Sequence, residues 1–229
     1  MHYGKLGRTG FEVSRISIGT EHLYGQPRDT VCQVIHQAVE AGVNYFDLVF
    51  SLPDYLDDMR AAFQGLRDRV LLTAHLGSTA KNGQYNQSRN AAQCERFFLD
   101  LLRRLDTGYV DVLFLHNFNS LKDWDQVARP GKVLDLALRL RSEGKARCLG
   151  ISAHYPDVVH KAVETGHVDV VMFPINLFGH AMPGRQQLQD LCLQHDIGLV
   201  AMKPFGGGKL LTQRGTFRVP KYQTAGQAF

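Results

Sequence analysis

Eight polar side chains stand at or just after short apolar runs that recur along the chain in the manner of successive strands. In a parallel barrel the carboxyl ends of the strands open on one face, and that face carries the active site. We therefore expect these groups to share one mouth, which is unusually rich in histidine. They are Glu21, His22, Asp47, His75, His116, His154, Asn176 and Lys203.

Carboxylate and imidazole groups at one mouth support two kinds of chemistry. Asp47, His75, His116 and His154 are ligand types that zinc or a related ion accepts, which gives a metal-dependent hydrolase as one hypothesis. Against it, no strand carries the histidine pair common in metal hydrolase barrels. Alternatively, a nearby carboxylate raises the pKa of a histidine, so Asp47 paired with His75 or His116 would form a general acid.

The apolar runs themselves predict seven strands. Near-continuous apolar strands separated by helical stretches are typical of a parallel sheet covered by helices. The clearest helix is predicted over 94–105, with Ser88 as its cap, and a second one ends at Gly144. The strand runs are 15–19, 45–49, 70–75, 110–116, 146–152, 169–176 and 198–203.

The order of these elements predicts an α/β fold, a (β/α)8 TIM barrel in one domain spanning residues 1–229. Ahead of the first strand, the segments 3–6 and 11–13 flank a glycine-containing turn and predict an N-terminal β-hairpin. An open doubly wound sheet is the alternative fold.

Composition limits the cellular location and the kinds of partner that we expect for this protein. The chain has 229 residues, 44% of them hydrophobic and 21% charged, with no apolar run long enough to span a bilayer. Its first residues resemble no secretory or transit signal, which favours a cytoplasmic protein. The net charge of +4 without a dense basic tract predicts no nucleic-acid partner. The cysteines are scattered and predict reduced thiols rather than a disulfide framework.

Several segments together resemble aldo-keto reductases along nearly the whole chain. They are G-K-L-G-R-T-G-F-E-V-S at 4–14, A-G-V-N-Y-F-D at 41–47, R-D-R-V-L-L-T-A-H-L-G at 67–77, R-R-L-D-T-G-Y-V-D-V-L-F-L-H-N at 103–117 and E-G-K-A-R-C-L-G-I-S at 143–152. The pieces S-A-H at 152–154 and M-K-P-F-G-G-G-K-L at 202–210 resemble a branch whose members often carry an iron–sulfur segment, which this sequence lacks. Relative to the family, the eighth βα unit is expected to be missing, as in a truncated chain.

The resemblance implies reduction of a small-molecule carbonyl by hydride transfer from NADP or NAD in its reduced form. It also implies a proton-donating tyrosine assisted by lysine and aspartate, with a histidine orienting the carbonyl. Asp47 and His116 match this pattern, whereas Leu52 stands at the tyrosine position and His75 at the lysine position. Leucine has no proton to give, which leaves two candidate acids. One is Tyr55, three residues further on, if Pro53 redirects the backbone into the mouth, and the other is a His75 or His116 imidazolium paired with Asp47.

The positions that hold the nicotinamide in the family are partly altered. Ser152 is kept, while Ala153 and Met172 stand where the family has asparagine and glutamine, and Met202 stands where an aromatic ring commonly stacks. Methionine can still pack on a flat ring. A glycine-rich run after the seventh strand suits a pyrophosphate. Its residues are Lys203, Phe205, Gly206, Gly207 and Gly208, followed by Lys209.

These observations predict an oxidoreductase of aldo-keto reductase type with an atypical active site. Two alternatives stay open at this stage. The altered positions are also what a barrel retained for nucleotide binding or assembly, without catalysis, would show. The second alternative is the metal-dependent hydrolase. The sequence leaves the oligomeric state undetermined.

Overall fold

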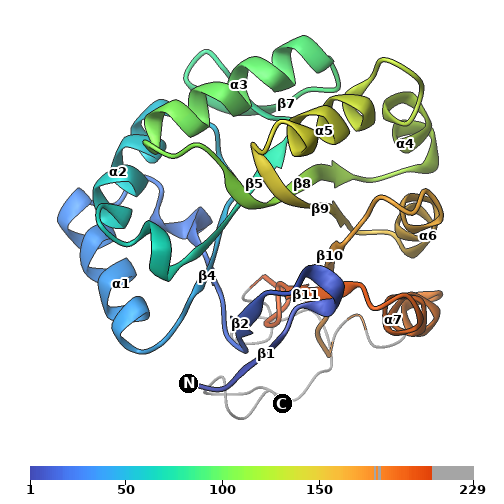
Figure 1. Cartoon of the computed structure of the whole chain (residues 1–229), viewed down its shortest axis with the longest axis horizontal. Coiled ribbons are helices and arrows are strands. Elements are labelled where there is room, and N and C mark those ends of the chain that lie inside the picture. Colours follow the sequence, from blue (N-terminus) through green and yellow to red (C-terminus); the bar gives the residue numbers. More distant parts are fainter. Residues whose placement is uncertain (178, 180–181, 208–229) are drawn as a thin grey trace, which may run out of the picture.

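The computed structural model describes residues 1–177, 179 and 182–207, and within them strands and helices alternate as the sequence predicts (Figure 1). The strands are β1 Tyr3–Lys5, β2 Glu12–Ser14, β3 Ile18–Gly19, β4 Tyr45–Leu48, β5 Leu71–Leu76, β6 Ser78–Lys81, β7 Gln84–Gln87, β8 Val110–Phe118, β9 Ala146–Ala153, β10 Val170–Pro174 and β11 Gly198–Met202. The helices are α1 Arg28–Glu40, α2 Pro53–Phe63, α3 Ala91–Arg104, α4 Leu121–Val127, α5 Val133–Ser142, α6 Pro156–Glu164 and α7 Arg185–Gln194, with short 3-10 turns at Gly7–Thr9, Thr20–Leu23 and Arg67–Arg69.

Seven strands form one curled parallel sheet in the order β3-β4-β5-β8-β9-β10-β11. Each strand therefore lies beside its predecessor along the chain, apart from the inserted β6–β7 hairpin. A doubly wound sheet requires a point at which the strand order reverses, and these strands have none. The sheet is of the (β/α)8 TIM-barrel type, as predicted, and within the described residues it runs as an open path from β3 to β11.

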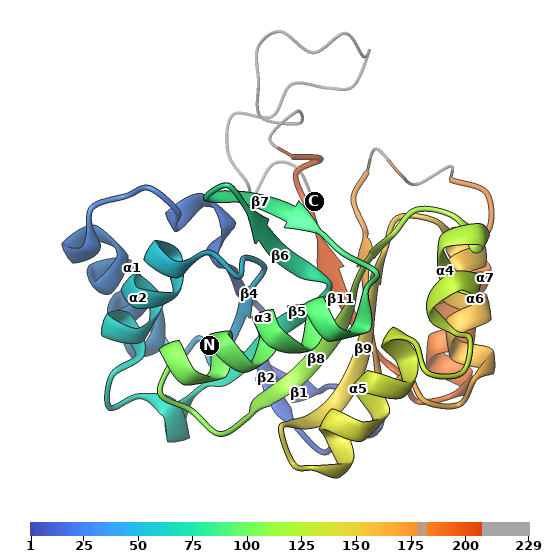
Figure 2. The same cartoon turned by 90° about the horizontal axis from the view of Figure 1, so that it is seen from above.

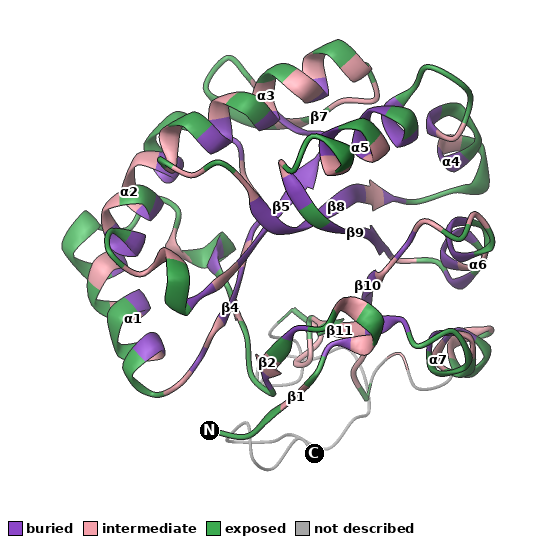
Figure 3. Cartoon of the chain, viewed as in Figure 1, coloured by how far each residue is buried: buried purple, intermediate pink, exposed green. Residues whose placement is uncertain are grey.

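The helices pack on the outer face of the sheet, with their buried sides turned inward and their exposed sides outward (Figure 3). Strand residues alternate between two cores because successive side chains point to opposite faces. On β8, Leu113 and Leu115 face the helices, while Val112 and Phe114 face the interior of the curl. No helix in the described part of the chain is long and apolar enough to cross a membrane.

The N-terminal hairpin closes the amino end of the curled sheet. Leu6 and Phe11 join the interior core with Tyr45, the first residue of β4. Gly7 is needed at this closure because its φ is +49° and a Cβ there would stand 2.3 Å from the backbone nitrogen of Gly198. Figure 2 shows this hairpin, β1–β2, at one end of the sheet and the β6–β7 hairpin at the other. The amino end is thus blocked, which leaves the carboxyl end for a site.

All seven predicted strand runs are confirmed, with differences of a few residues at their ends. Two features differ from prediction. The segment between β5 and α3 forms the β6–β7 hairpin, joined by Asn82 and Gly83, which both adopt positive φ. The cap of α3 is also not Ser88, because Asn90 accepts the hydrogen bond from the Gln93 backbone N–H at 2.9 Å. Ser88 instead accepts from the Asn90 backbone N–H at 3.1 Å.

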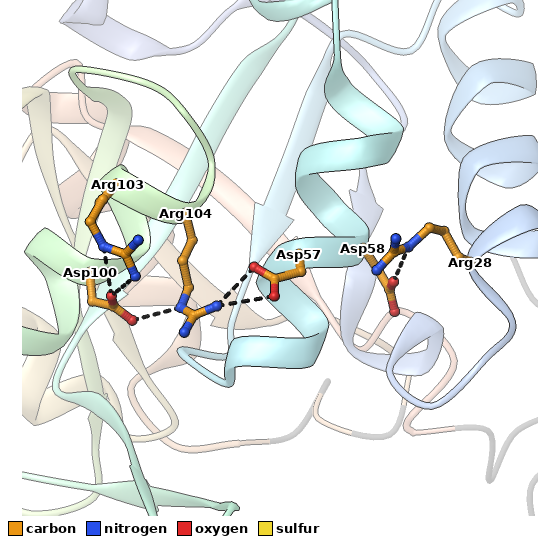
Figure 4. Close-up of polar contacts among 6 residues, drawn as sticks. All are labelled: Arg28, Asp57, Asp58, Asp100, Arg103 and Arg104. Carbon is orange, nitrogen blue, oxygen red and sulfur yellow. Dashed lines mark hydrogen bonds and ion pairs between the residues drawn. The ribbon is translucent and has the colours of Figure 1, made fainter.

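Ion pairs connect the first three outer helices (Figure 4). Adjacent residues of α2 reach in two directions: Asp58 to Arg28 of α1 at 2.7 Å, and Asp57 to Arg104 of α3 at 2.9 Å. Arg104 also pairs with Asp100 on its own helix at 2.9 Å. Solvent-exposed ion pairs contribute little to stability individually, so these pairs orient helices that apolar burial already holds in place.

Candidate active site

The carboxyl end of the interior is polar because the inward-facing residues change character along each strand. On β5 they are Leu71, Thr73 and His75, and on β8 they end at His116. Asp47 continues the inward face of β4 two residues after Tyr45. The predicted convergence of Asp47, His75 and His116 from three neighbouring strands is therefore what the structure shows.

These three side chains form a continuous hydrogen-bonded series. His75 Nε2 lies 2.9 Å from Asp47 Oδ1, and His75 Nδ1 lies 3.0 Å from His116 Nδ1. The Thr73 hydroxyl donates to the same Asp47 oxygen. Both imidazoles are buried, with 4% of their surface exposed. The series thus carries a carboxylate and two coupled proton-binding rings from β4 to β8.

Tyr85 extends the series to the surface, and the sequence analysis missed it. It projects from β7, and its hydroxyl lies 2.5 Å from His116 Nε2. Gln87, two residues on and therefore on the same face of the hairpin, donates to the Tyr85 hydroxyl at 2.9 Å. The available signal was the Asn82-Gly83 pair, since Asn-Gly between strand-like segments is a strong indicator of a tight hairpin.

Burial sets the proton affinities of the exposed end of the series. The pKa of His116 is well below its usual value because burial disfavours the imidazolium, and electrostatic interactions with His75, Arg89 and His154 lower it further. The expectation that a carboxylate would raise the pKa of this histidine is therefore wrong for His116. Partial burial raises the pKa of Tyr85, so its phenol is protonated at neutral pH.

One glycine makes room for the ring that supports His75. Phe114 stacks on His75 with ring centroids 5.3 Å apart and planes 26° from parallel. Phe114 fills the space beside Gly150 of β9, where a Cβ would stand 2.5 Å from the phenyl ring. The missing side chain at Gly150 therefore positions a catalytic candidate through Phe114.

Tyr55 does not reach the mouth, which corrects the prediction. Helix α2 begins at Pro53, and Tyr55 lies on the buried side of its first turn with 1% of its surface exposed. Its hydroxyl is hydrogen-bonded to Thr20, and its ring packs against Phe50 and Tyr24. Burial raises the pKa of this phenol strongly. Leu52, just before the helix, is buried as well.

The metal site required by the hydrolase hypothesis is not assembled by the described residues, in which no three His, Cys, Asp or Glu side chains are arranged to hold an ion. Both ring nitrogens of His75 already contact Asp47 and His116. His154 contacts Lys203 instead, with its Nε2 3.0 Å from the Lys203 ammonium. The hydrolase hypothesis therefore has no support in the geometry.

The predicted nicotinamide contacts lie on neighbouring strands of the same interior. Ser152 of β9 and Met172 of β10 are paired in the sheet register, and each has 5% of its surface exposed. Met202, at the end of β11, packs on the interior core. Beside them, the Nδ1 atom of His154 is buried and has no hydrogen-bond partner in the structure as described. Polar and apolar groups thus lie together on neighbouring strands at the carboxyl end of the interior.

The glycine-rich segment after β11 begins with a tight turn. Lys203, Gly206 and Gly207 adopt positive φ, and the Gly206 backbone N–H donates to the Lys203 carbonyl at 2.9 Å. The Asn176 amide also donates to the Lys203 carbonyl, which joins this turn to the end of β10. Phe205 is part of the turn. Gly208 and Lys209 lie outside the described residues, as do residues 210–229, so the expectation of a missing eighth βα unit stays a prediction.

A curled parallel sheet with outer helices and a polar site at the strand carboxyl ends defines a protein of the TIM-barrel class. The model of the Aldo/keto reductase family matches residues 15–225. This chain therefore belongs to the aldo/keto reductase family.

Among the relatives, "Probable aldo-keto reductase 1" of Glycine max is 24% identical over 89% of this chain, and L-glyceraldehyde 3-phosphate reductase of Escherichia coli O157:H7 is 23% identical over 96%. The chain spans 59% and 66% of the lengths of these two relatives. The holo form of aldo-keto reductase AKR11C1 from Bacillus halodurans has a similar structure, with a TM-score of 0.79 and 22% identity over 97% of this chain and 72% of that one. At this identity the structural likeness shows the fold.

Proposed function

We propose that this protein is an oxidoreductase that reduces a small-molecule carbonyl with NADPH or NADH. The observation that carries the proposal is the hydrogen-bonded series from Asp47 through His75 to His116 at the carboxyl end of the sheet, in a chain of this family. Relatives named as reductases include an NADH-specific methylglyoxal reductase of Escherichia coli K12, 22% identical over 90% of this chain.

The residues present fit a nicotinamide ring. The buried and unpartnered Nδ1 of His154 is a polar group that a carboxamide would satisfy, and the Ser152 hydroxyl precedes it by two residues on β9. Met172 and Met202 supply a polarizable apolar surface for a flat ring. Gly206 and Gly207 provide a turn without side chains for the phosphates. When bound, the reduced nicotinamide supplies the hydride.

The protein's part in this reaction is to bind the carbonyl group and to deliver a proton to its oxygen. His75, at the position of the family's lysine, connects Asp47 to His116 by hydrogen bonds, whereas a lysine would place an ammonium there. His116 is held so that only its Nε2 atom faces outward from the pair. Proton transfer from this site therefore goes through the outer edge of His116.

Native mass spectrometry of the purified chain with added NADPH or NADH tests the proposal directly, read together with oxidation of the nucleotide by a panel of quinones, aldehydes and 1,2-dicarbonyls. One nucleotide per chain and turnover of at least one carbonyl are expected. Bound nucleotide without turnover of any carbonyl would favour a barrel retained for binding. A metal adduct without nucleotide would overturn the proposal in favour of the hydrolase.

A further inference from the structure

We propose that Tyr85, carried into the mouth by the β6–β7 hairpin, is the proton donor to the carbonyl oxygen, and that the series His116, His75 and Asp47 returns its proton. This inference rests on the proposed function and names the acid that the reaction requires. It assigns the role to a residue on a different element from Leu52 or Tyr55, which lie at the start of α2.

The placement of Tyr85 suits a donor that must reach both the protein interior and a substrate. Its hydroxyl contacts the buried His116, while 38% of its residue surface is exposed. Its ring packs edge-on against Phe50, with centroids 5.4 Å apart, which fixes the ring without covering it. By contrast, Tyr55 has 1% of its surface exposed and makes its hydroxyl contact with Thr20.

The contacts fix the direction of every hydrogen bond when both histidines are neutral. An ionised Asp47 can only accept, so His75 donates from Nε2 and its Nδ1 is an acceptor. His116 must then donate from Nδ1 and accept at Nε2. The Tyr85 hydroxyl therefore points its proton at His116, away from a substrate.

One added proton reverses the last bond. When His116 is an imidazolium, it donates from Nδ1 to His75 and from Nε2 to the Tyr85 oxygen. The Tyr85 proton is then free to turn toward a carbonyl. The series with one extra proton is thus the form that donates, and the neutral series is the form left after donation.

The chemical step balances with this one proton. The carbonyl carbon gains the hydride, the π electron pair moves to the oxygen, and that oxygen forms its O–H bond with the Tyr85 proton. The Tyr85 oxygen takes the Nε2 proton of His116, which becomes neutral, and solvent later restores that proton. The substrate gains two electrons and two hydrogens, the nucleotide loses two electrons and one hydrogen, and the second hydrogen comes from water.

The surroundings set the pH at which the donor form exists. The charged or titratable groups acting on His116 are His75, Arg89 and His154, and burial further lowers its pKa. Tyr85 is also acted on by Glu21 and by Arg89. Because the imidazolium is disfavoured, the donor form becomes more populated as pH falls. Reduction should therefore speed up toward acidic pH, through a step that requires the Tyr85 hydroxyl.

The experiment compares Tyr85→Phe with two matched variants in the full chain. Tyr24→Phe is the control because Tyr24 is also exposed and also packs edge-on against Phe50, at 5.6 Å. Tyr55→Phe tests the rival donor. We expect Tyr85→Phe to lose about a hundredfold or more in kcat, as for loss of a general acid, and to lose the acidic rise in rate. Its nucleotide affinity should stay within about twofold, and Tyr24→Phe should retain its turnover.

The turnover of the wild type and of the variants distinguishes a failure of the Tyr85 assignment from a failure of the proposed function. A wild-type chain that reduces no carbonyl overturns both. An active wild type with an equally active Tyr85→Phe variant overturns only the Tyr85 assignment, as does a larger loss in Tyr55→Phe. Nitrogen NMR of labelled histidines gives a readout without turnover: Tyr85→Phe should shift the His116 Nε2 resonance, and an unchanged resonance would contradict the contact.

Discussion

Substituting Gly150 by alanine should destabilise the protein and weaken the site at the same time. The added Cβ would stand 2.5 Å from two atoms of the Phe114 ring and 2.9 Å from the Val170 carbonyl oxygen. Neither group can move aside without a cost in stability, because Phe114 is fully buried and the Val170 carbonyl belongs to a neighbouring strand. Overpacking of this kind costs about 1 to 3 kcal/mol.

For a domain of this size, each 1 kcal/mol lowers the melting temperature by roughly 2 to 4 °C. We therefore expect the Gly150→Ala variant to melt about 2 to 12 °C below the wild type by circular dichroism. Gly108→Ala is the control, since a Cβ there has no atom within 4 Å. A Gly150→Ala variant that melts with the wild type would refute the packing argument. A second variant with Phe114→Leu added should recover part of the loss, because the smaller side chain relieves the contact.

Three further predictions follow from the site and the surface. Asp47→Asn should lower carbonyl turnover by roughly tenfold or more, because an amide can no longer fix the His75 proton, and unchanged kcat would contradict the series. His116 has a lowered pKa in the fold, so its contribution to stability is present above its unfolded pKa of about 6.5 and decreases as pH falls below it. Urea unfolding at pH 7 and 5.5 should show a smaller loss in His116→Gln than in the wild type. Arg104→Met removes the pairs with Asp57 and Asp100 and should cost at most about 2 kcal/mol at low salt and less in 1 M NaCl. A larger, salt-independent loss would show that these pairs are not screened surface contacts.

Much of the fold follows from local pattern. The apolar runs specify the strands, and their period of two places Asp47, His75 and His116 on one face once the first inward residue of each strand is known. The hairpin that carries Tyr85 could also be predicted from local sequence, from the Asn82-Gly83 pair. The place where this hairpin packs could not be predicted from that pair. That position depends on how the hairpin packs against β8 and Phe50.

Tyr55 is a residue whose position could not be predicted from local sequence. Its spacing from Leu52 made it the natural substitute in the sequence, but Pro53 begins a helix, and the helix turns Tyr55 into the packing between α2 and the Thr20–Leu23 turn. The choice between two tyrosines was therefore decided by tertiary packing. Ser88 and Asn90 illustrate the same limit at a helix start, where either side chain could serve as the cap and the hairpin exit selects Asn90.

The most direct test of the central claim follows the hydride itself. The purified chain is incubated with a reactive carbonyl and with reduced nicotinamide nucleotide deuterated at the C4 position, and the product is analysed by mass spectrometry. The wild type should form an alcohol with one deuterium on the former carbonyl carbon, and Tyr85→Phe should form much less of it. Absence of labelled alcohol for every carbonyl and both nucleotides would contradict it.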